Sequence, residues 1–207
     1  MKKTAIRLAL AAIICLTTAL PVFAEAPAQT LAGLKSFAIE GVGTASLSGN
    51  IVFASAVGTE TMKNMETQYD LTATADGNSH YARLLVYKDG RDMGPALALV
   101  DLVEFKPELV ALMSSTGQKL LTRKMEENGA KLLEWLPPSK ISVQKHNGVQ
   151  FGSRFILAEK FPIPMYATVA VYPGDGKLTG IALMCPDSDR TYWQPVFTQL
   201  ITSLVAN

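Results

Sequence analysis

The sequence of 207 residues lacks the means to build a disulfide framework. Its two cysteines are Cys15 and Cys185, and Cys15 lies in an N-terminal segment that we expect to be removed. Because Cys185 then has no internal partner, the fold must be held by its core rather than by disulfide bridges. The chain also lacks an excess of charge, with 19 Lys and Arg against 18 Asp and Glu. Nucleic-acid binding requires clustered basic residues, so no nucleic-acid partner is expected.

Long hydrophobic runs are confined to the N-terminus. The run Leu8–Leu20 follows a basic start and is too short to span a bilayer comfortably, and Ala24 closes a small-residue cleavage pattern. Residues 1–24 are therefore predicted to be a signal peptide for export through the Sec pathway to the periplasm or the extracellular space. Ile14 precedes Cys15 where a lipoprotein would have a small residue, so lipidation is not expected. No transmembrane anchor is expected after cleavage.

The rest of the chain is predicted to form a flexible tail over residues 25–36 and a single α+β domain over residues 37–207. The strands are expected at Phe37–Glu40, Thr44–Ala56, Glu66–Ala75, Ser79–Lys88, Ile141–His146, Val149–Leu157, Tyr166–Tyr172 and Lys177–Met184. Asp76-Gly77-Asn78 and Asn147-Gly148 predict tight hairpin turns, and a further turn is expected at residues 173–176. The two prolines of the segment 161–164 are expected to break regular pairing.

Two segments have helical spacing. Apolar residues recur every three to four positions after Lys106, and Asn128-Gly129 is a typical helix end, which predicts one long central helix. A second apolar stripe over residues 193–204 predicts a C-terminal helix. Pro195 suits this helix only if the helix begins near it, with an entry turn over residues 187–192.

Cys185 could be a reactive thiol or the end of a buried strand. It shares a strand face with Ile181 and Leu183, and the opposite side is also apolar, which favours the buried strand. A thiol among aliphatic side chains is unreactive. The acids that follow, Asp187 and Asp189, are interpreted as helix-capping residues. A divalent cation is the alternative, but two acids offer too few ligands for calcium.

No other motif indicates chemistry. His80 and His146 lie on separate predicted hairpins, without the ligand spacing of a zinc site, and His146 is expected to be exposed. The glycines at 41 and 43 lack the full phosphate-binding pattern, so a bend is predicted there. We therefore predict no catalytic residues, no metal and no cofactor.

The second half of the chain resembles the PsbP-like fold, which is shared by a photosystem II extrinsic protein, a Ran-binding nuclear import factor and exported bacterial proteins. The resemblance rests on the strand pairs over residues 143–157 and 167–184 and on the stripe Trp193–Leu204. It implies an α/β/α sandwich around a mostly antiparallel sheet. Because members of the family bind very different partners, the resemblance implies a fold more than a function.

Two classes of function are open. The first is an exported, non-catalytic binding or assembly module of the bacterial cell envelope, whose partner would be a protein or another envelope component. The alternative is an exported small-ligand carrier or enzyme, whose site is not visible as a motif. The candidate partner-binding residues are Phe161, Ile163, Arg190 and Tyr192, which are predicted to meet at the sheet end opposite the 173–176 turn. If this surface is not functional, Phe161 and Trp193 are expected to fill the core and Arg190 to pair with Asp187 or Asp189.

Overall fold

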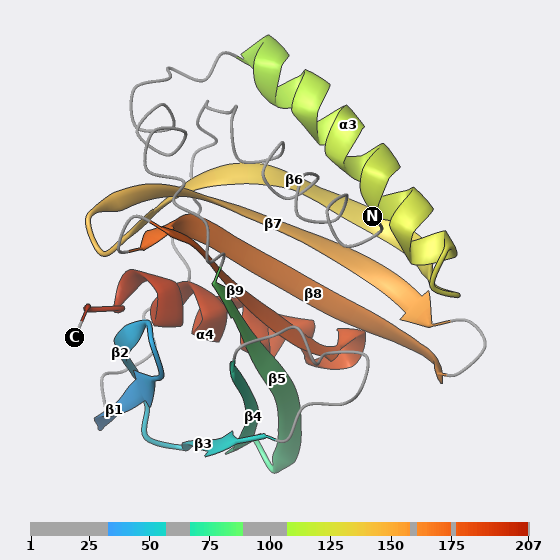
Figure 1. Cartoon of the computed structure of the whole chain (residues 1–207). Coiled ribbons are helices and arrows are strands. Elements are labelled where there is room, and N and C mark those ends of the chain that lie inside the picture. Colours follow the sequence, from blue (N-terminus) through green and yellow to red (C-terminus); the bar gives the residue numbers. More distant parts are fainter. Residues whose placement is uncertain (1–32, 57–66, 89–106, 158–160, 175–176, 207) are drawn as a thin grey trace.

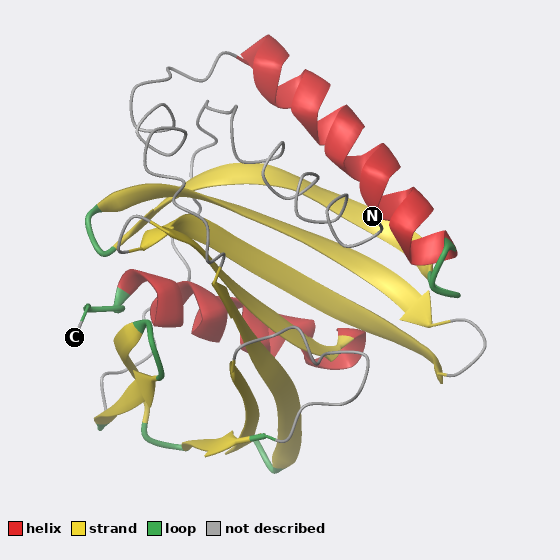
Figure 2. Cartoon of the chain, in the orientation of Figure 1, coloured by secondary structure: helices red, strands yellow, loops and turns green. Residues whose placement is uncertain are grey.

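The computed structural model describes residues 33–56, 67–88, 107–157, 161–174 and 177–206. Figure 1 shows that they form a large twisted sheet with the long helix α3 beside one edge and the helix α4 below. Figure 2 shows how strongly strands outweigh helices in the described part of the chain. The predicted α+β class with a mostly antiparallel sheet is confirmed.

The elements follow the chain as β1 (Leu34–Ile39), β2 (Gly43–Ser48), β3 (Ile51–Ser55), β4 (Thr67–Ala75), β5 (Asn78–Lys88), α3 (Pro107–Glu126), β6 (Lys131–Val143), β7 (His146–Leu157), β8 (Phe161–Gly174), β9 (Lys177–Pro186), a short 3-10 turn (Asp187–Asp189) and α4 (Arg190–Thr202). The residues before 33, the first residue predicted for the long helix and the turn residues 175 and 176 lie outside the described part.

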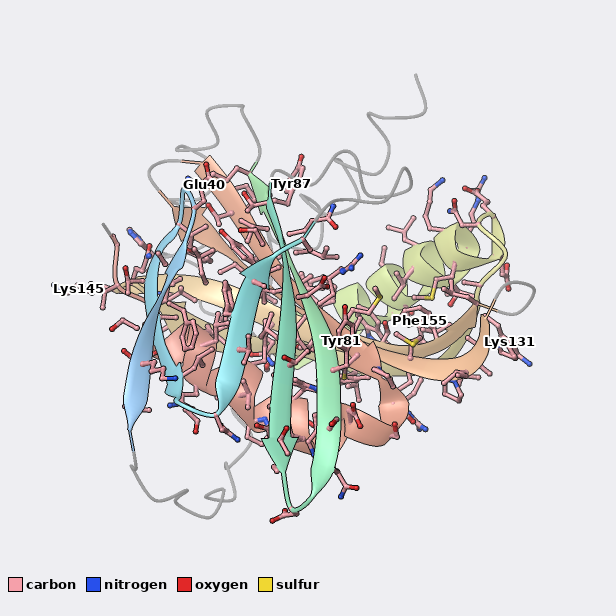
Figure 3. The ribbon with its side chains drawn as sticks, turned by 90° about the horizontal axis from the view of Figure 1, so that it is seen from below. Glu40, Tyr81, Tyr87, Lys131, Lys145 and Phe155 are labelled. Atoms are coloured by element: carbon pink, nitrogen blue, oxygen red, sulfur yellow. The ribbon has the colours of Figure 1, made fainter. Side chains whose placement is uncertain are left out.

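Seven strands form one sheet in the order β3-β4-β5-β9-β8-β7-β6, and all neighbouring strands are antiparallel. Strands β6 to β9 follow one another as hairpins, and β5 pairs with β9. This pairing places the N-terminal strands beside the last strand of the chain (Figure 1). In Figure 3, Lys131 marks the start of the long strand β6, and Lys145 marks the turn that follows its other end.

The core lies mainly on one face of this sheet. Side chains alternate between the two faces of a strand, and the pair β1–β2 and helix α4 pack on the core face. Its large buried side chains include Leu71, Leu84, Ile181, Leu183, Trp193 and Phe197. Each such side chain stabilises the fold by about 1.5–3 kcal/mol. On the opposite face, Trp135 Nε1 of β6 donates a hydrogen bond to Ser114 Oγ of α3 over 2.9 Å.

The predicted turn at Asp76-Gly77 is confirmed. Both residues have positive φ, 50° and 76°, and Ala75 pairs directly with Asn78. This is the geometry of a two-residue hairpin turn, and glycine adopts it at no steric cost.

The turn predicted at Asn147-Gly148 is wrong. The hairpin turns at Gln144 and Lys145, whose φ angles are 50° and 70°, and Gly148 lies inside β7. A Cβ at Gly148 would lie 2.7 Å from the carbonyl oxygen of Val171 on the next strand, so glycine is needed there for strand packing. The turn itself is fixed by a distant contact, because Gln144 Nε2 donates to the carbonyl of Val42 over 3.0 Å.

Other boundaries also differ from expectation. Strand β6 begins at Lys131 rather than Ile141, and β8 begins at Phe161 rather than Tyr166. Residues 44–56 form two strands rather than one, because the chain turns at residues 49 and 50 and β2 joins a separate two-stranded sheet. Strand β1 begins at Leu34, inside the range predicted as a tail. Helix α4 begins at Arg190, so Pro195 lies inside the helix instead of near its start.

Two local predictions hold. The long helix ends at Glu126, and Gly129 follows with a φ of 71°. In β8 the prolines interrupt regular pairing: Pro164 pairs with Ile156, and the next pair joins Phe161 to Leu157, so the register shifts at this point.

Candidate partner-binding site

Cys185 is a buried structural residue, as the strand pattern predicts. Its side chain is 1% exposed and packs in the core with Ile181 and Leu183. Burial, with a smaller contribution from the charges of Asp189 and Asp187, raises the pKa of the thiol to about 12. A thiol with such a pKa is almost wholly protonated at neutral pH, so it is a poor nucleophile.

The acids after Cys185 do not cap α4. Asp189 is the N-cap residue by position, but its side chain makes no cap hydrogen bond. Asp187 instead binds Arg154 of β7 with both oxygens: Nε donates over 2.8 Å and Nη2 over 2.5 Å. The other side of the Arg154 guanidinium donates to Glu134 of β6 over 3.1 Å. These bonds, those to Asp187 first, raise the pKa of Arg154 and hold the guanidinium charged.

Arg190 belongs to the same cluster. Its Nη1 lies 3.5 Å from Glu134 Oε2, and its guanidinium carbon lies 5.1 Å from the centre of the Tyr166 ring. The predicted alternative, in which Arg190 pairs with Asp187 or Asp189, is therefore wrong, because Asp187 is engaged by Arg154. We call Glu134, Arg154, Tyr166, Asp187 and Arg190 the arginine cluster. Tyr166 is 1% exposed, and its burial raises the pKa of its hydroxyl.

Tyr192 lies in a different cluster, toward β5. Its ring stacks on His80, with centroids 4.2 Å apart and an interplanar angle of 3°, and its hydroxyl accepts a bond from Asn50 over 3.3 Å. Asp189 Oδ2 accepts from the backbone N–H of Tyr81 over 3.1 Å. His80 Nδ1 lies 3.4 Å from Asp189 Oδ1, without hydrogen-bond geometry. We call His80, Asp189, Tyr192 and Asn50 the histidine cluster.

The histidine cluster does not have the geometry of a catalytic triad. Ser188 is the serine next to it in sequence, and its Oγ lies 3.5 Å from Asp189 Oδ1, so the hydroxyl is directed to the acid and not to the imidazole. Among the described residues, no three His, Cys, Asp or Glu side chains gather in a group that could hold a metal ion.

Among the predicted site residues whose side chains the structure describes, Ile163 is the most exposed, at 49%. It lies at the β8 end where Met165 pairs with Pro186, so the predicted placement of both segments at one end of the sheet is correct. Arg190 and Tyr192, however, contact different strands through the arginine and histidine clusters. Phe161 pairs with Leu157 through its backbone, and its side chain is outside the described part.

Two further exposed side chains at this end of the sheet were not predicted. Leu133 at the start of β6 is 41% exposed and Leu157 at the end of β7 is 36% exposed. With Ile163 they form what we call the apolar rim, at the same end of three neighbouring strands. The β6–β7 register shift beside Leu133 is the structural cause of its position, and alternation in the sequence gives no signal of such a bulge.

The comparisons with known proteins bear on the fold. No family model matches the chain, and no curated protein matches its sequence. Among solved structures it is similar to the cyanobacterial PsbP protein CyanoP of Synechocystis sp. PCC 6803, with 10% identity and a TM-score of 0.50, over 89% of this chain and 98% of the other. The chain therefore has a PsbP-like fold, as the resemblance of its second half implies.

Two weaker similarities accompany this match. A protein of unknown function from Pseudomonas aeruginosa has 10% identity and a TM-score of 0.40 over 85% of this chain and 99% of the other. LpqN, involved in cell envelope biogenesis of Mycobacterium tuberculosis, has 10% identity and a TM-score of 0.42 over 84% and 90%. Within the part of the chain that the structure describes, no helix has the length and apolar character needed to cross a membrane.

Proposed function

We propose that this protein is an exported, non-catalytic binding or assembly module of the cell envelope, and that its partner contacts the apolar rim beside the arginine cluster. One observation carries the proposal. At this end of the sheet the charged groups are engaged with one another, while Leu133, Leu157 and Ile163 expose apolar surface. Apolar side chains surrounded by ordered charged groups are typical of a docking surface.

The chemistry of Cys185 and of the arginine cluster supports binding rather than catalysis. The thiol of Cys185 is buried and protonated, and the carboxylates of Glu134 and Asp187 form ion pairs with Arg154. A general acid or base must be within reach of the proton that it transfers, whereas these carboxylates are engaged by the hydrogen bonds from Arg154. Arg190, which is stacked on Tyr166 and is 26% exposed, is the charged group we expect to reach the partner.

The proposal is tested by recovering partners from the native envelope with tagged protein. We expect Ile163→Asp to lose the specific partner, because a charge replaces exposed apolar surface, and to keep the melting temperature of the wild type. Val205→Asp is the matched control, since Val205 is also an exposed β-branched apolar residue, at 66%, and lies just beyond the C-terminal end of α4. If Ile163→Asp recovers the same partner as the control, the apolar rim is not the site.

Export and architecture are part of the same proposal. We expect cleavage after Ala24, which N-terminal sequencing of the exported protein would detect as a new terminus at Glu25. An intact Met1 terminus in a membrane fraction would contradict it.

We also propose that residues 37–207 form one domain arranged as an α/β/α sandwich. In support, α4 packs on the core face and α3 contacts Trp135 on the other face.

A further inference from the structure

The two edges of the seven-stranded sheet are built differently. The edge strand β6 contains Pro137 and Pro138, where its register with β7 shifts, and it carries the charged residues Lys131, Glu134 and Lys140. Helix α3 lies beside this edge (Figure 1). Prolines, charges and a covering helix are the devices by which proteins prevent another strand from pairing with an edge. The opposite edge strand, β3, has the sequence IVFAS, without proline or charge.

Half of the backbone groups of β3 point away from the sheet. The N–H of Ala56 donates to the carbonyl of Gln68 on β4 over 2.8 Å, so the residues at alternate positions, Val52 and Ala54, also direct their backbone groups to β4. Ile51, Phe53 and Ser55 therefore direct their N–H and C=O groups outward. Within the described ranges, no strand pairs with this outer edge.

Apolar side chains line this edge on both faces of the sheet. On the core face, the ring of Phe53 lies 4.5 Å from the Tyr69 ring and 5.3 Å from the Phe37 ring. On the other face, Val52 is 61% exposed and shares a row with Thr72 and with Tyr81, which is 46% exposed. A strand added at β3 would thus find apolar neighbours for its alternate side chains on both faces.

The size of the edge favours a peptide over a second copy of the chain. Five residues of strand span about 17 Å. A stable interface between two copies buries about 1,200 Å² or more. A second copy would also have to pass the β1–β2 pair, whose Phe37 ring contacts Phe53. A single extended segment needs only the backbone ladder and a few side-chain contacts.

We propose that the outer edge of β3 binds an extended, uncharged peptide segment of a partner protein as an added strand, with apolar residues at alternate positions. This segment pairs with Ile51, Phe53 and Ser55. Because β3 lies at the opposite edge of the sheet from the apolar rim, the segment occupies a second surface. Its binding is independent of the site proposed above.

The test is a phage-displayed library of seven-residue peptides in which Val or Ile alternates with Thr or Ser, selected on the protein in the form its host makes. We expect selected peptides to bind wild type and Ser55→Ala and to lose binding to Ser55→Pro. Both substitutions remove the Ser55 hydroxyl, but only proline removes the outward N–H. Binding should persist in Ile163→Asp, which separates this proposal from the apolar rim.

Hydrogen exchange gives a second readout. With peptide bound, the outward amides of Phe53 and Ser55 should exchange more slowly, whereas the amide of Ala54, already bonded to β4, should not change. Three outcomes would overturn the proposal. The first is a library from which no peptide is enriched, and the second is a set of peptides that bind Ser55→Pro as tightly as wild type. The third is slower exchange of the Phe53 amide when the protein concentration is raised without peptide, which would identify a second copy of the chain as the occupant.

Discussion

The two sides of the 3-10 turn that leads into α4 are held by different chemistry. On one side Asp187 binds Arg154 of β7 through two short hydrogen bonds to a guanidinium. On the other side Asp189 accepts one bond from the backbone of Tyr81 on β5 and approaches the imidazole of His80. The two acids are two positions apart in one 3-10 turn, yet they contact strands separated by β9 and β8. A short acidic turn can thus position the start of a helix through contacts to two strands, β5 and β7, without capping that helix.

The largest effect is expected from Trp193, the core side chain in the first turn of α4, which follows the acidic turn. Trp193→Ala should lower the free energy of unfolding by about 3–5 kcal/mol, because it leaves a cavity where a fully buried indole packs. Chemical denaturation measures this loss. Tyr192→Phe is the control, since it keeps the ring stacked on His80 and removes only the bond from Asn50. Equal losses in the two variants would contradict the assignment of Trp193 as the anchor.

Cys185 should give the next largest effect. Cys185→Ser should lower the free energy of unfolding by about 1–3 kcal/mol, because a hydroxyl replaces a thiol in an apolar setting. In a Cys15→Ser background, a bulky thiol reagent should label Cys185 only when the protein unfolds, since the folded thiol is buried and its pKa is about 12. Rapid labelling of the native protein would contradict this prediction, because it would show that the thiol of Cys185 is accessible to solvent in the folded state.

The two acids can be compared directly. Asp187→Asn and Asp189→Asn make the same chemical change two residues apart, and we expect the first to lower the melting temperature more. Asp187 forms paired, charge-assisted hydrogen bonds to Arg154, whereas Asp189 makes one backbone bond and a longer approach to His80. Calorimetry on both variants under one condition measures the difference. Equal shifts would mean that both sides hold the turn equally.

The smallest effect is expected from the ion pair between Asp70 and Arg83. This pair belongs to neither cluster, so it serves as a reference with which the effects in both clusters can be compared. Burial alone would raise the pKa of Asp70, but hydrogen bonds from Arg83 and Tyr81 outweigh it and lower the pKa below the ordinary 3.8. Because the folded pKa is depressed, this contribution to stability is present above pH 3.8 and is lost as the pH falls through the folded pKa.

Melting temperatures of wild type and Asp70→Asn check this pH dependence. They should differ modestly at neutral pH, because the pair is partly exposed, and converge in acid. The same substitution should return the pKa of Tyr81 toward 10, since its hydrogen bond to Asp70 is the main cause of the upward shift. Ultraviolet titration against Tyr81→Phe would detect this change. A difference in melting temperature that persists in acid would contradict the assignment.

Local sequence signals predicted the parts of the fold that depend on neighbours in the chain. The Asp76-Gly77 turn forms as predicted, and among the described residues beyond its chain neighbours no atom lies within 4 Å of where a Cβ of Gly77 would be. Alternation correctly places Cys185 beside Leu183 on the core face. The turn predicted at Asn147-Gly148 is wrong because Gly148 lies within β7, where only glycine leaves room for the backbone of Val171 on β8. This contact depends on the neighbouring strand, so the local sequence does not indicate it.

The candidate site was predictable only in its location. The strand order placed Ile163 and the start of α4 at one end of the sheet, as observed. The partners that decide its chemistry were not predictable, because Arg154 lies 33 positions before Asp187 and Tyr81 lies 108 positions before Asp189. Nothing local in the sequence indicates that two acids in one turn reach strands so distant in the chain.

The order of strands in the sheet also has a consequence for how the chain folds. Strands β6 to β9 are consecutive hairpins, so each pairing closes a short loop, whereas pairing β5 with β9 must first close a loop that contains α3 and the whole meander. Short loops close at a lower entropic cost and at higher rates. We expect the meander to form early and the N-terminal strands to dock late, so the β5–β9 seam is where a nascent or partly unfolded chain would open first.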